Sequence, residues 1–509
     1  MTYGFSIQSM RSFIKIFFGY EGALLVMYYQ AVMSQLSTKE MKLNNTPVNA
    51  SPAKKFFVDM LTRDIELTDA ILDLVDNCLD GAMRSISTNP VKNYNGFYTN
   101  LIMDKDKFII EDNCGGISAE RAENEAFRLG NTNFGKERTV PTIGVYGIGM
   151  KRAMFKMGSH SIVSTKTDED EYEVEIRPDW LIDDSNWYLP LTHKATGLNH
   201  NGTRIEITQI RDGISRLLGD KIVFQSDLMN VISNHFAIVI NKGFKISLNG
   251  QVIKPSLTTL LYDENAFKNG DGITPYVYTN EQNGVSIELS VGFYRDLTTD
   301  DEDVEYLESK TSSEKAGWTV ICNDRVVIYS DKTRLTGWGE AGVPAYHTQF
   351  IGIAGVVKFT SNDASLLPVT TTKRGIDGNS DLYLAVKDYM REGLKTFINF
   401  TNKWKSYGNS NNTIKSMSNK SLPATSSELI NIIPKKQLKA NPKPFGGKIY
   451  KPSLPLPKVI NKTKLIKYSV EIDEFNQVAE YLFDDVNVPA VDVGRKTFDK
   501  MLKEALENE

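Results

Sequence analysis

The chain of 509 residues is poor in the side chains that build disulfide frameworks and metal centres. It has three cysteines, Cys78, Cys114 and Cys322, no Cys-x-x-Cys pair, and five scattered histidines. An odd and widely spaced set of cysteines argues against a disulfide framework and against a thiolate zinc site. Because this usage favours a reducing compartment, we expect a cytoplasmic protein.

Long apolar runs and a strong net charge are also missing. Residues 12–33 are the most apolar stretch, but Lys15 and Glu21 interrupt it. No uninterrupted run therefore reaches the roughly 18 apolar residues that span a bilayer, and a signal peptide also fits poorly. The formal net charge is −4 and the pI is about 5.9. Contact with nucleic acid would therefore need a local basic patch.

Residues 1–50 are expected to be an N-terminal extension, and three interpretations of them remain open. In the first, the working start is Met33 or Met41 and the residues before it are an extension from an upstream start codon. In the second, the segment is an arm that packs on a second subunit, and in the third it attaches the protein to a membrane. The first interpretation is the simplest, and membrane attachment is the least favoured because of the two interrupting charges.

What the chain does contain is typical of a soluble protein of several domains, with 41% hydrophobic and 24% charged residues. Residues 51–213 alternate helical patterns with short β-rich runs, which predicts an α/β domain. Residues 214–402 carry further strand-like segments and then a helix-like run from Asp381, which predicts a separate α+β domain. The expected fold class is therefore α/β (α+β).

The C-terminal part changes in composition. Residues 401–470 hold fourteen lysines, one acidic residue, seven prolines and no arginine, so we expect a Lys/Pro-rich linker over 403–467. The last 39 residues reverse the charge, with eleven acidic against four basic residues. Their helical periodicity predicts a small acidic helical tail over 468–509.

An acidic helix over residues 66–85 is the most informative segment. Its apolar residues recur three and four positions apart and predict a buried stripe of Leu72, Val75, Leu79 and Ala82. The opposite face carries Asp69, Asp73, Asp76, Asn77 and Asp80. Asp73 and Asn77 project together, which suits a residue that activates water beside a magnesium ligand. The alternative is a solvated acidic face, although such a face normally includes cations.

A second motif follows a short apolar strand that ends at Asp112. The chain then turns through Gly115 and Gly116. A carboxylate at this position can accept a hydrogen bond from the exocyclic amine of a purine, and glycines let a flat ring approach the backbone. Taken alone, the composition Asp-Asn-x-Gly-Gly is also common in structural turns.

A third motif is a glycine-rich segment that leads into a helix containing Lys151. Its glycines are Gly144, Gly147 and Gly149. Glycine-rich backbone before a helix is typical of phosphate binding. The segment is not a P-loop, and it lacks the dinucleotide fingerprint because Arg152 stands where the last glycine or alanine should be. Residues 128–141, just upstream, are polar and rich in Gly and Asn, which predicts a lid over a ligand.

The order of these motifs, completed by Gly202 and Thr203 at the start of a predicted strand, resembles the GHKL ATPase superfamily. Its members include type II topoisomerase ATPase subunits, the ninety-kilodalton heat-shock chaperone, MutL, MORC proteins and sensor histidine kinases. The resemblance implies the Bergerat fold, in which a mixed sheet is backed by helices. It also implies ATP with Mg²⁺, held between the helices and the lid.

Carried over to this sequence, the resemblance assigns Asp73 as the catalytic base and Asn77 as the magnesium ligand. The nucleotide-binding residues that it implies are Asn77, Asp80, Asp112, Gly116, Gly144, Gly147, Gly149, Lys151 and Thr203. Two positions depart from the family. Asp73 stands where hydrolytic members usually have glutamate, which predicts slow hydrolysis, and Cys114 replaces the first glycine of the adenine loop.

The second domain resembles the transducer domain of the gyrase, MutL and MORC group, on the strength of residues 322–330 and 367–377. In these families a transducer lysine senses the γ-phosphate, and Lys373 is the candidate for this catalytic role. The alternative is a threonine-rich surface loop with exposed cations. A sensor kinase is not expected because the first histidine, His160, lies inside the ATPase domain.

Together these features predict a slow Mg²⁺-dependent ATPase that acts as a conformational switch and forms an ATP-dependent homodimer. The alternatives are a non-hydrolysing ATP-liganded scaffold or protein-interaction module, and an enzyme that transfers phosphate to a protein side chain. The net charge of +13 over residues 401–470 suggests contact with DNA or RNA. The scarcity of aromatics and the lack of arginine there favour a solvated linker instead. The acidic tail is expected either to dock a protein partner that the sequence does not identify or to fold back on the linker.

Overall fold

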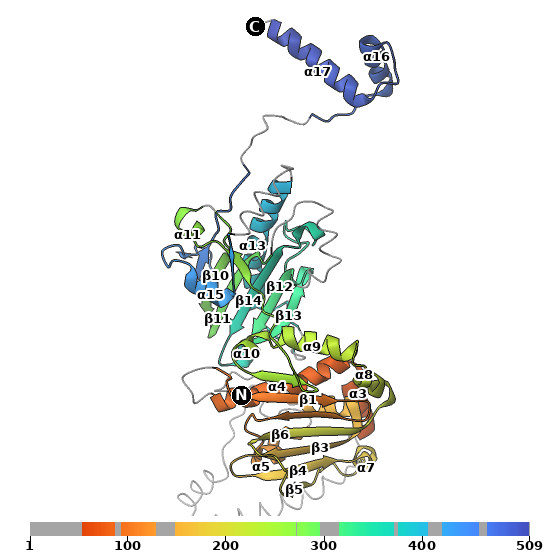
Figure 1. Ribbon diagram of the computed structural model, residues 1–509, viewed down its shortest axis with the longest axis vertical. Coiled ribbons are helices and arrows are strands. Elements are labelled where there is room, and N and C mark those ends of the chain that lie inside the picture. The colour runs from red at the N-terminus through yellow and green to blue at the C-terminus, as the bar shows by residue number, and fades with distance from the viewer. Residues whose placement is uncertain are drawn as a thin grey trace, which may run out of the picture.

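The computed structural model describes residues 53–86, 93–128, 148–270, 272–295, 315–370, 375–405, 420–457 and 466–507. This part of the chain folds into two large sheets, each with its own hydrophobic core, and a C-terminal pair of helices (Figure 1). The expected α/β (α+β) class is confirmed. Residues 1–50, most of the expected lid, Gly144, Gly147 and Lys373 lie outside the described residues.

The first sheet has eight strands in the order β5-β4-β3-β6-β2-β1-β7-β8, and β1 and β7 are its only parallel neighbours among the described strands. The strands are β1 (Tyr98–Met103), β2 (Phe108–Asp112), β3 (Gly158–Lys166), β4 (Glu171–Ile176), β5 (Leu191–His193), β6 (Gly202–Ile210), β7 (Lys245–Leu248) and β8 (Gln251–Val252). Each of the predicted strands that enter this sheet is present.

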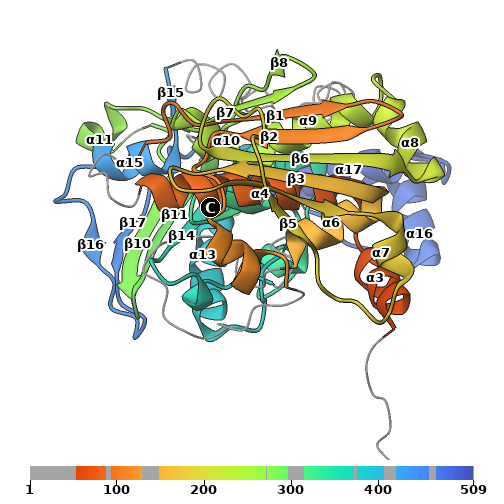
Figure 2. The same cartoon turned by 90° about the horizontal axis from the view of Figure 1, so that it is seen from below.

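Helices cover one face of this sheet. The longer ones are α3 (Lys54–Arg63), α4 (Leu67–Ile86), α6 (Gly149–Met157) and α9 (Phe224–His235). The shorter ones are α5 (Ala119–Arg121), η1 (Ala122–Ala126), α7 (Pro178–Ile182), α8 (Asp212–Gly219) and α10 (Ala237–Asn241). On β1, Leu101 is buried while its neighbour Ile102 is exposed, so the sheet buries one face and leaves the other to solvent. The four residues of the predicted apolar stripe on α4 are all buried in this core, and α4 and α6 lie along the covered face (Figure 2).

The first unit continues past residue 213, where we expected it to end. Strand β7 pairs in parallel with β1, and apolar residues of α9 and β7, such as Ile232 and Ile246, belong to the first core. The difference has a physical reason: β1 would otherwise be an edge strand with unpaired backbone groups, and β7 satisfies them. A parallel partner needs a long crossover, which α8, α9 and α10 supply.

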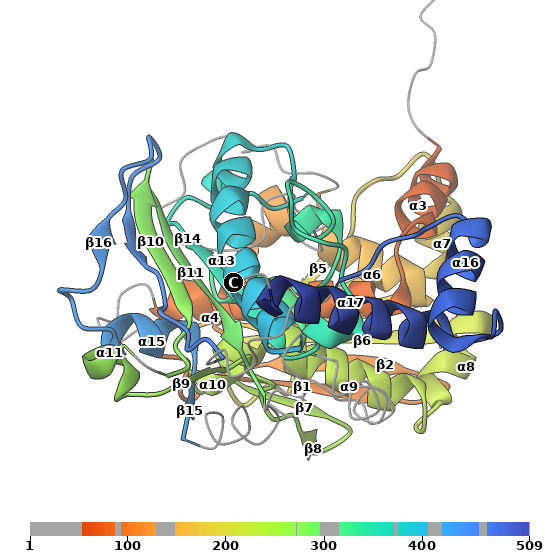
Figure 3. The same cartoon turned by 90° about the horizontal axis from the view of Figure 1, so that it is seen from above.

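The second sheet has seven strands in the order β13-β12-β14-β11-β10-β17-β16. They are β10 (Tyr276–Gln282), β11 (Val285–Phe293), β12 (Gly317–Cys322), β13 (Arg325–Asp331), β14 (Ile353–Thr360), β16 (Lys439–Ala440) and β17 (Lys448–Tyr450). Helix α13 (Asp381–Lys405) packs across one face (Figure 3). Tyr389 of α13 stacks on Tyr278 of β10 with ring centroids 3.9 Å apart. The helix sits close to the sheet because Gly393 has no side chain, and a Cβ there would lie 2.3 Å from Cγ1 of Val291.

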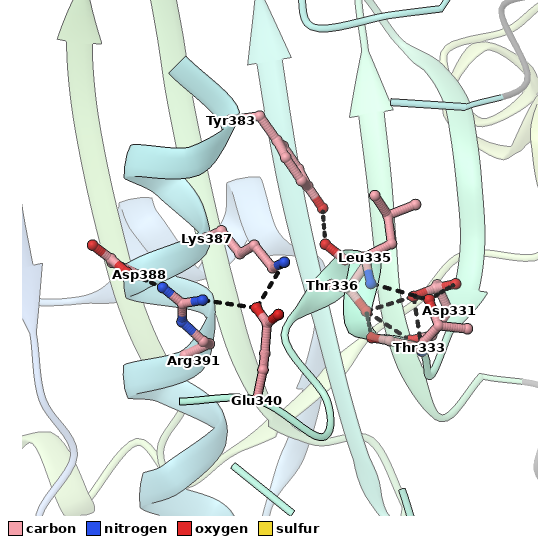
Figure 4. A network of polar contacts seen from close by, with 9 residues as sticks. All are labelled: Asp331, Thr333, Leu335, Thr336, Glu340, Tyr383, Lys387, Asp388 and Arg391. Atoms are coloured by element: carbon pink, nitrogen blue, oxygen red, sulfur yellow. Dashed lines mark hydrogen bonds and ion pairs between the residues drawn. The ribbon is translucent and has the colours of Figure 1, made fainter. Parts of the chain in front are cut away.

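A polar network ties α13 to the segment that follows β13 (Figure 4). Glu340 accepts hydrogen bonds from Lys387 and Arg391 of α13, both at 2.7 Å. Tyr383 donates to the backbone oxygen of Leu335 at 3.0 Å, within the 3₁₀ helix η2 (Arg334–Thr336). These contacts hold the segment after β13 against α13.

Much of the expected linker is folded. Residues 420–457 contribute β15 (Leu422–Ala424), which pairs with β9 (Leu260–Tyr262), then α15 (Ser426–Ile432), and then β16 and β17 on the edge of the second sheet. Ile449 and Tyr450 are buried, and Trp404 donates to the backbone oxygen of Pro455 at 3.1 Å. The lysine-rich composition did not indicate these elements, because a few apolar residues are enough to fix a short edge strand.

The C-terminal residues form helices α16 (Ile472–Phe483) and α17 (Ala490–Glu507), which pack on each other around Ala479 and Val493. Several of their larger apolar side chains are exposed, including Tyr481, Val491 and Phe498. Throughout the described part of the chain, no helix combines the length and the apolar character needed to cross a membrane.

Candidate nucleotide-binding site

The acidic face of α4 is buried. Asp76 is 0% exposed, and Asp73 and Asp80 are each 4% exposed, whereas Asn77 is half-buried. Carboxylates leave water only where partners or ligands compensate them. This burial disagrees with a plain solvated face and agrees with a functional one.

Asp73 is held by an arginine that the sequence analysis did not select. Its Oδ2 accepts a hydrogen bond from Nη2 of Arg152 at 2.7 Å, and both side chains are largely buried. Arg152 lies three residues after Gly149, in the first turns of α6. A Cβ on Gly149 would lie 3.3 Å from Oδ2 of Asp73, so the glycine lets α6 approach the carboxylate closely. The only sequence signal for Arg152 is its place directly after the glycine-rich segment and Lys151.

Asn77 is suited to a single-residue role at a magnesium ion. Its side chain makes no hydrogen bond to any other described residue, in contrast to its paired neighbours Asp73 and Asp76. Among the described residues, no group of three or more His, Cys, Asp or Glu side chains could hold a metal ion. Magnesium bound with a nucleotide needs few protein ligands because phosphate and water oxygens complete its octahedron. The residues present therefore fit a nucleotide-borne ion better than a protein-built metal centre.

Asp112 begins a row of polar side chains across three neighbouring strands. It lies opposite Thr203 in the β2–β6 register, and Thr203 lies opposite Thr165 in the β3–β6 register. Oδ1 of Asp112 accepts from the backbone N–H of Cys114 at 2.8 Å, and the hydroxyls of Thr165 and Thr203 are 3.2 Å apart. Thr165 was missed because nothing in its local sequence marks it; the sheet register alone places it here.

The environment of Asp112 is apolar enough to disturb its ionisation. Burial raises the pKa of Asp112, opposed by hydrogen bonds from the backbone of Cys114, the thiol of Cys78 and the backbone of Thr203. Cys78 belongs to α4, one residue after Asn77. The contact between Cys78 and Asp112 therefore joins the expected adenine-binding carboxylate to the helix that carries Asp73 and Asn77.

Glycines allow the turn after β2 to pack between α4 and β3. Gly116 has φ +73°, and a Cβ there would lie 2.2 Å from the backbone oxygen of Lys166. A Cβ on Gly81 of α4 would lie 2.8 Å from the backbone oxygen of Cys114. Gly116 thus has a backbone reason to be glycine that is independent of any bound ring.

Lys151 and the start of α6 form the expected phosphate end. No side chain caps the start of α6 at Ile148. Nζ of Lys151 donates to the backbone oxygen of Ala126 at 2.8 Å, at the end of η1, and the side chain is 3% exposed. Burial lowers the pKa of Lys151 to about 8. In this conformation Lys151 therefore anchors the segment that precedes the expected lid.

Asp80 lies one turn further along α4, near a second arginine that the sequence analysis did not select. Burial lowers the pKa of Arg84 to about 10, and Arg121 lowers it further, while Asp80 and Asp112 raise it. Asp80 thus balances a half-buried cation at the Asp112 end of α4. This electrostatic role is compatible with the nucleotide-binding role that was expected.

Comparison with known families agrees with this geometry. Residues 65–204 match the model of the histidine kinase-, DNA gyrase B-, and HSP90-like ATPase family. The matched range begins just before α4 and ends just after Thr203, so it contains every described residue that we expected to bind nucleotide. No curated protein matches the chain significantly. The match identifies residues 65–204 as a GHKL-type ATP-binding domain, similar to those of histidine kinases, DNA gyrase B and HSP90.

Proposed function

We propose that the chain binds Mg²⁺-ATP, hydrolyses it slowly, and uses the bound nucleotide to drive a conformational switch between two subunits. One observation supports this above the others. Asp73 and Asn77 lie on the same helix as Cys78, which contacts Asp112. The group suited to adenine, at the end of β2, therefore lies against the helix that carries the groups suited to the γ-phosphate.

The roles follow from the chemistry of each side chain. Asp112 accepts a hydrogen bond from the exocyclic amine of adenine, and Thr203 with Thr165 holds water beside the ring. Asn77 offers its amide oxygen to the magnesium ion, which neutralises charge on the phosphates. The N–H groups at the start of α6, and Lys151 after it leaves the oxygen of Ala126, bind the phosphate oxygens.

Hydrolysis depends on Asp73. As general base it accepts a proton from the attacking water. The ion pair with Arg152 engages Oδ2 of this carboxylate, so that oxygen is less available to accept the proton. This pair supports slow turnover and also favours a second candidate function, a nucleotide-liganded scaffold that does not hydrolyse ATP.

The output is proposed to be a change in subunit arrangement, in the manner of the gyrase, MutL and MORC group. In this proposal, Lys373 reports the γ-phosphate to the second domain, and two copies close together. We further propose that the protein acts in the cytoplasm, since Cys78, Cys114 and Cys322 are all buried free thiols. A protein partner at the acidic tail, and nucleic acid at the lysine-rich segment, belong to the same proposal.

The test is Mg²⁺-dependent ATP turnover by the purified protein beside two variants, Asp73→Asn and Asn77→Ala. Loss of a general base lowers turnover by roughly 100-fold or more, so Asp73→Asn should be nearly inactive while still binding ATP. Asn77→Ala should lose the Mg²⁺ dependence of ATP binding. Native mass with a non-hydrolysable analogue should show a dimer that is absent without nucleotide.

Each result separates the candidates. Tight ATP binding without turnover in the wild-type protein supports the scaffold, whereas absence of binding contradicts both functions. Transfer of labelled phosphate to a protein side chain would instead indicate a kinase. Unchanged turnover in Asp73→Asn would show that Asp73 is not the base.

A further inference from the structure

The second domain contacts the ATPase domain through the tip of the hairpin formed by β12 and β13. The two turn residues, Asn323 and Asp324, have φ values of +46° and +65°, as in the tight turns that suit a twisted hairpin. Strand β13 packs against α9 and α10 of the first unit. The turn therefore presents Asp324 and Arg325 directly to the ATPase domain.

Arg325 is fully buried at this contact. Its Nε donates to Oδ1 of Asp76 at 2.6 Å, and neither side chain is exposed. Its Nη1 donates to the backbone oxygens of His235 at 3.1 Å and Val326 at 2.9 Å. The guanidinium carbon lies 4.2 Å from the centroid of the Phe236 ring. Contacts from α4, α9 and β13 thus fix the guanidinium in one orientation.

Asp76 connects this arginine to the nucleotide site. It precedes Asn77 on α4 and follows Asp73 by three residues, so any rotation or shift of α4 at Asp76 also moves Asn77 and Asp73. A buried charge pair tolerates little displacement, because each charge needs its partner once water is excluded. The position of α4 is therefore tied to the position of the β12–β13 hairpin.

A neighbouring ion pair also joins the β12–β13 hairpin to the first unit, but it lies away from the nucleotide site. Oδ2 of Asp324 accepts from Nζ of Lys242 at 2.5 Å and from the hydroxyl of Tyr94 at 3.4 Å. The Lys242 side chain is 35% exposed. Lys242 lies in the loop after α10 and, among the described residues, makes no hydrogen bond or ion pair with α4. It therefore joins the domains without joining the hairpin to the nucleotide site.

We propose that Arg325 is a positioning residue for the nucleotide site, which holds Asn77 and Asp73 in place through Asp76 and couples ATP binding to the second sheet. The inference rests on the proposed ATP-binding function. Coupling between two sites is reciprocal, so ATP binding must change the hairpin contact as much as the hairpin contact changes ATP binding.

The experiment compares Arg325→Gln, Asp76→Asn and the double variant with Lys242→Ala as the matched control. The full-length proteins are assayed for ATP affinity with and without Mg²⁺, for turnover, and for hydrogen exchange in β12 and β13 with and without a non-hydrolysable analogue. We expect Arg325→Gln to lower Mg²⁺-ATP affinity or turnover about tenfold or more, and the double variant to be no worse than the worse single variant. Lys242→Ala should stay within about twofold of wild type, and Arg325→Lys should restore part of the loss.

Nucleotide should slow hydrogen exchange in the hairpin of the wild-type protein but not of Arg325→Gln. A folded Arg325→Gln protein with wild-type affinity, turnover and nucleotide-dependent exchange would falsify the inference. Equal losses in Lys242→Ala would also contradict it, because they would show a general docking effect. If Arg325→Gln does not fold, the Arg325→Lys variant decides. Wild-type affinity, turnover and exchange in Arg325→Lys would reject the inference that the guanidinium of Arg325 positions the site. Wild-type protein that does not bind ATP contradicts the proposed function itself, which is a distinct result.

Discussion

At the scale of single residues, Asp112 shows how a binding group opposes stability. Its carboxyl is buried, and burial raises its pKa above the ordinary value of 3.8. A group whose pKa is raised on folding contributes stability that is present below the unfolded pKa and is lost as pH rises through the folded pKa. At neutral pH the ionised Asp112 therefore costs stability, although it is the form that accepts a hydrogen bond from adenine in the proposed function.

We predict that Asp112→Asn lowers ATP affinity by about tenfold or more, since a hydrogen bond to a charged group is lost. Its unfolding free energy at pH 7 should equal or exceed that of wild type, and this advantage should shrink as pH falls towards 3.8. Chemical denaturation at several pH values measures it. Asp179→Asn, which changes an exposed carboxylate on α7, is the control and should show no such trend. A variant that is less stable at pH 7 by a pH-independent amount would contradict the prediction.

At the scale of elements, α4 is the helix around which the site is built. Its apolar stripe packs on the first sheet, while Asp73, Asp76 and Cys78 contact α6, β13 and the end of β2 respectively. Gly81 completes these contacts by letting the turn at Cys114 approach the helix backbone. A single helix thus carries Asp73 and Asn77, contacts the end of β2 where Asp112 lies, and contacts the second domain.

We predict that Gly81→Ala destabilises the protein, against the usual gain from replacing a helical glycine. The new Cβ would lie 2.8 Å from the backbone oxygen of Cys114, and overpacking of this kind costs roughly 1–3 kcal/mol. Gly213→Ala in α8 is the matched control, because no atom lies within 4 Å of its Cβ position, and it should stabilise by up to about 1 kcal/mol. Urea denaturation measures the change in unfolding free energy for both variants. Equal changes would show that the turn at Cys114 moves away from the new Cβ without cost.

At the scale of the whole molecule, the lysine-rich segment both completes the second sheet and carries exposed positive charge. Its apolar residues complete the second sheet, and two of its lysines, Lys443 and Lys451, pair with Glu392 of α13 at 2.7 and 2.6 Å. Lys435, Lys436 and Lys439 are exposed, and within the described part of the chain they form no ion pair. Deleting the segment would therefore remove strands β16 and β17 together with the charge, so that loss of binding after deletion would not identify the charge as its cause.

Nucleic-acid contact is better tested by neutralising charge while keeping the fold. We predict that the triple variant Lys435→Gln, Lys436→Gln, Lys439→Gln keeps the unfolding temperature and ATP binding of wild type. If the segment contacts phosphates, the slope of log affinity for DNA or RNA against log salt concentration should fall by about three. The control neutralises three exposed lysines elsewhere, Lys55, Lys105 and Lys221, and should leave the slope unchanged. An unchanged slope in the first variant would remove this segment from nucleic-acid binding.

Local patterns in the sequence determined the elements and most of the candidate site. The strands β2, β3, β6, β7 and β11 to β14 follow from runs of apolar and β-branched residues, because strand periodicity is a property of neighbouring residues. The buried stripe of α4 follows from spacings of three and four. The order of Asn77, Asp112, Gly149 and Thr203 indicated the GHKL superfamily, and the family match over residues 65–204 confirms it.

Only the tertiary structure decided which distant residues meet. Arg152 reaches Asp73 across 79 positions of sequence, and Arg325 reaches Asp76 across 249. The sequence does not indicate which residue pairs with which, because an ion pair depends on where two elements cross and not on the residues beside each charge. The same reason explains why β7 joined the first sheet and why part of the lysine-rich segment joined the second. Unpaired strand edges are satisfied by whichever apolar segment the fold brings to them.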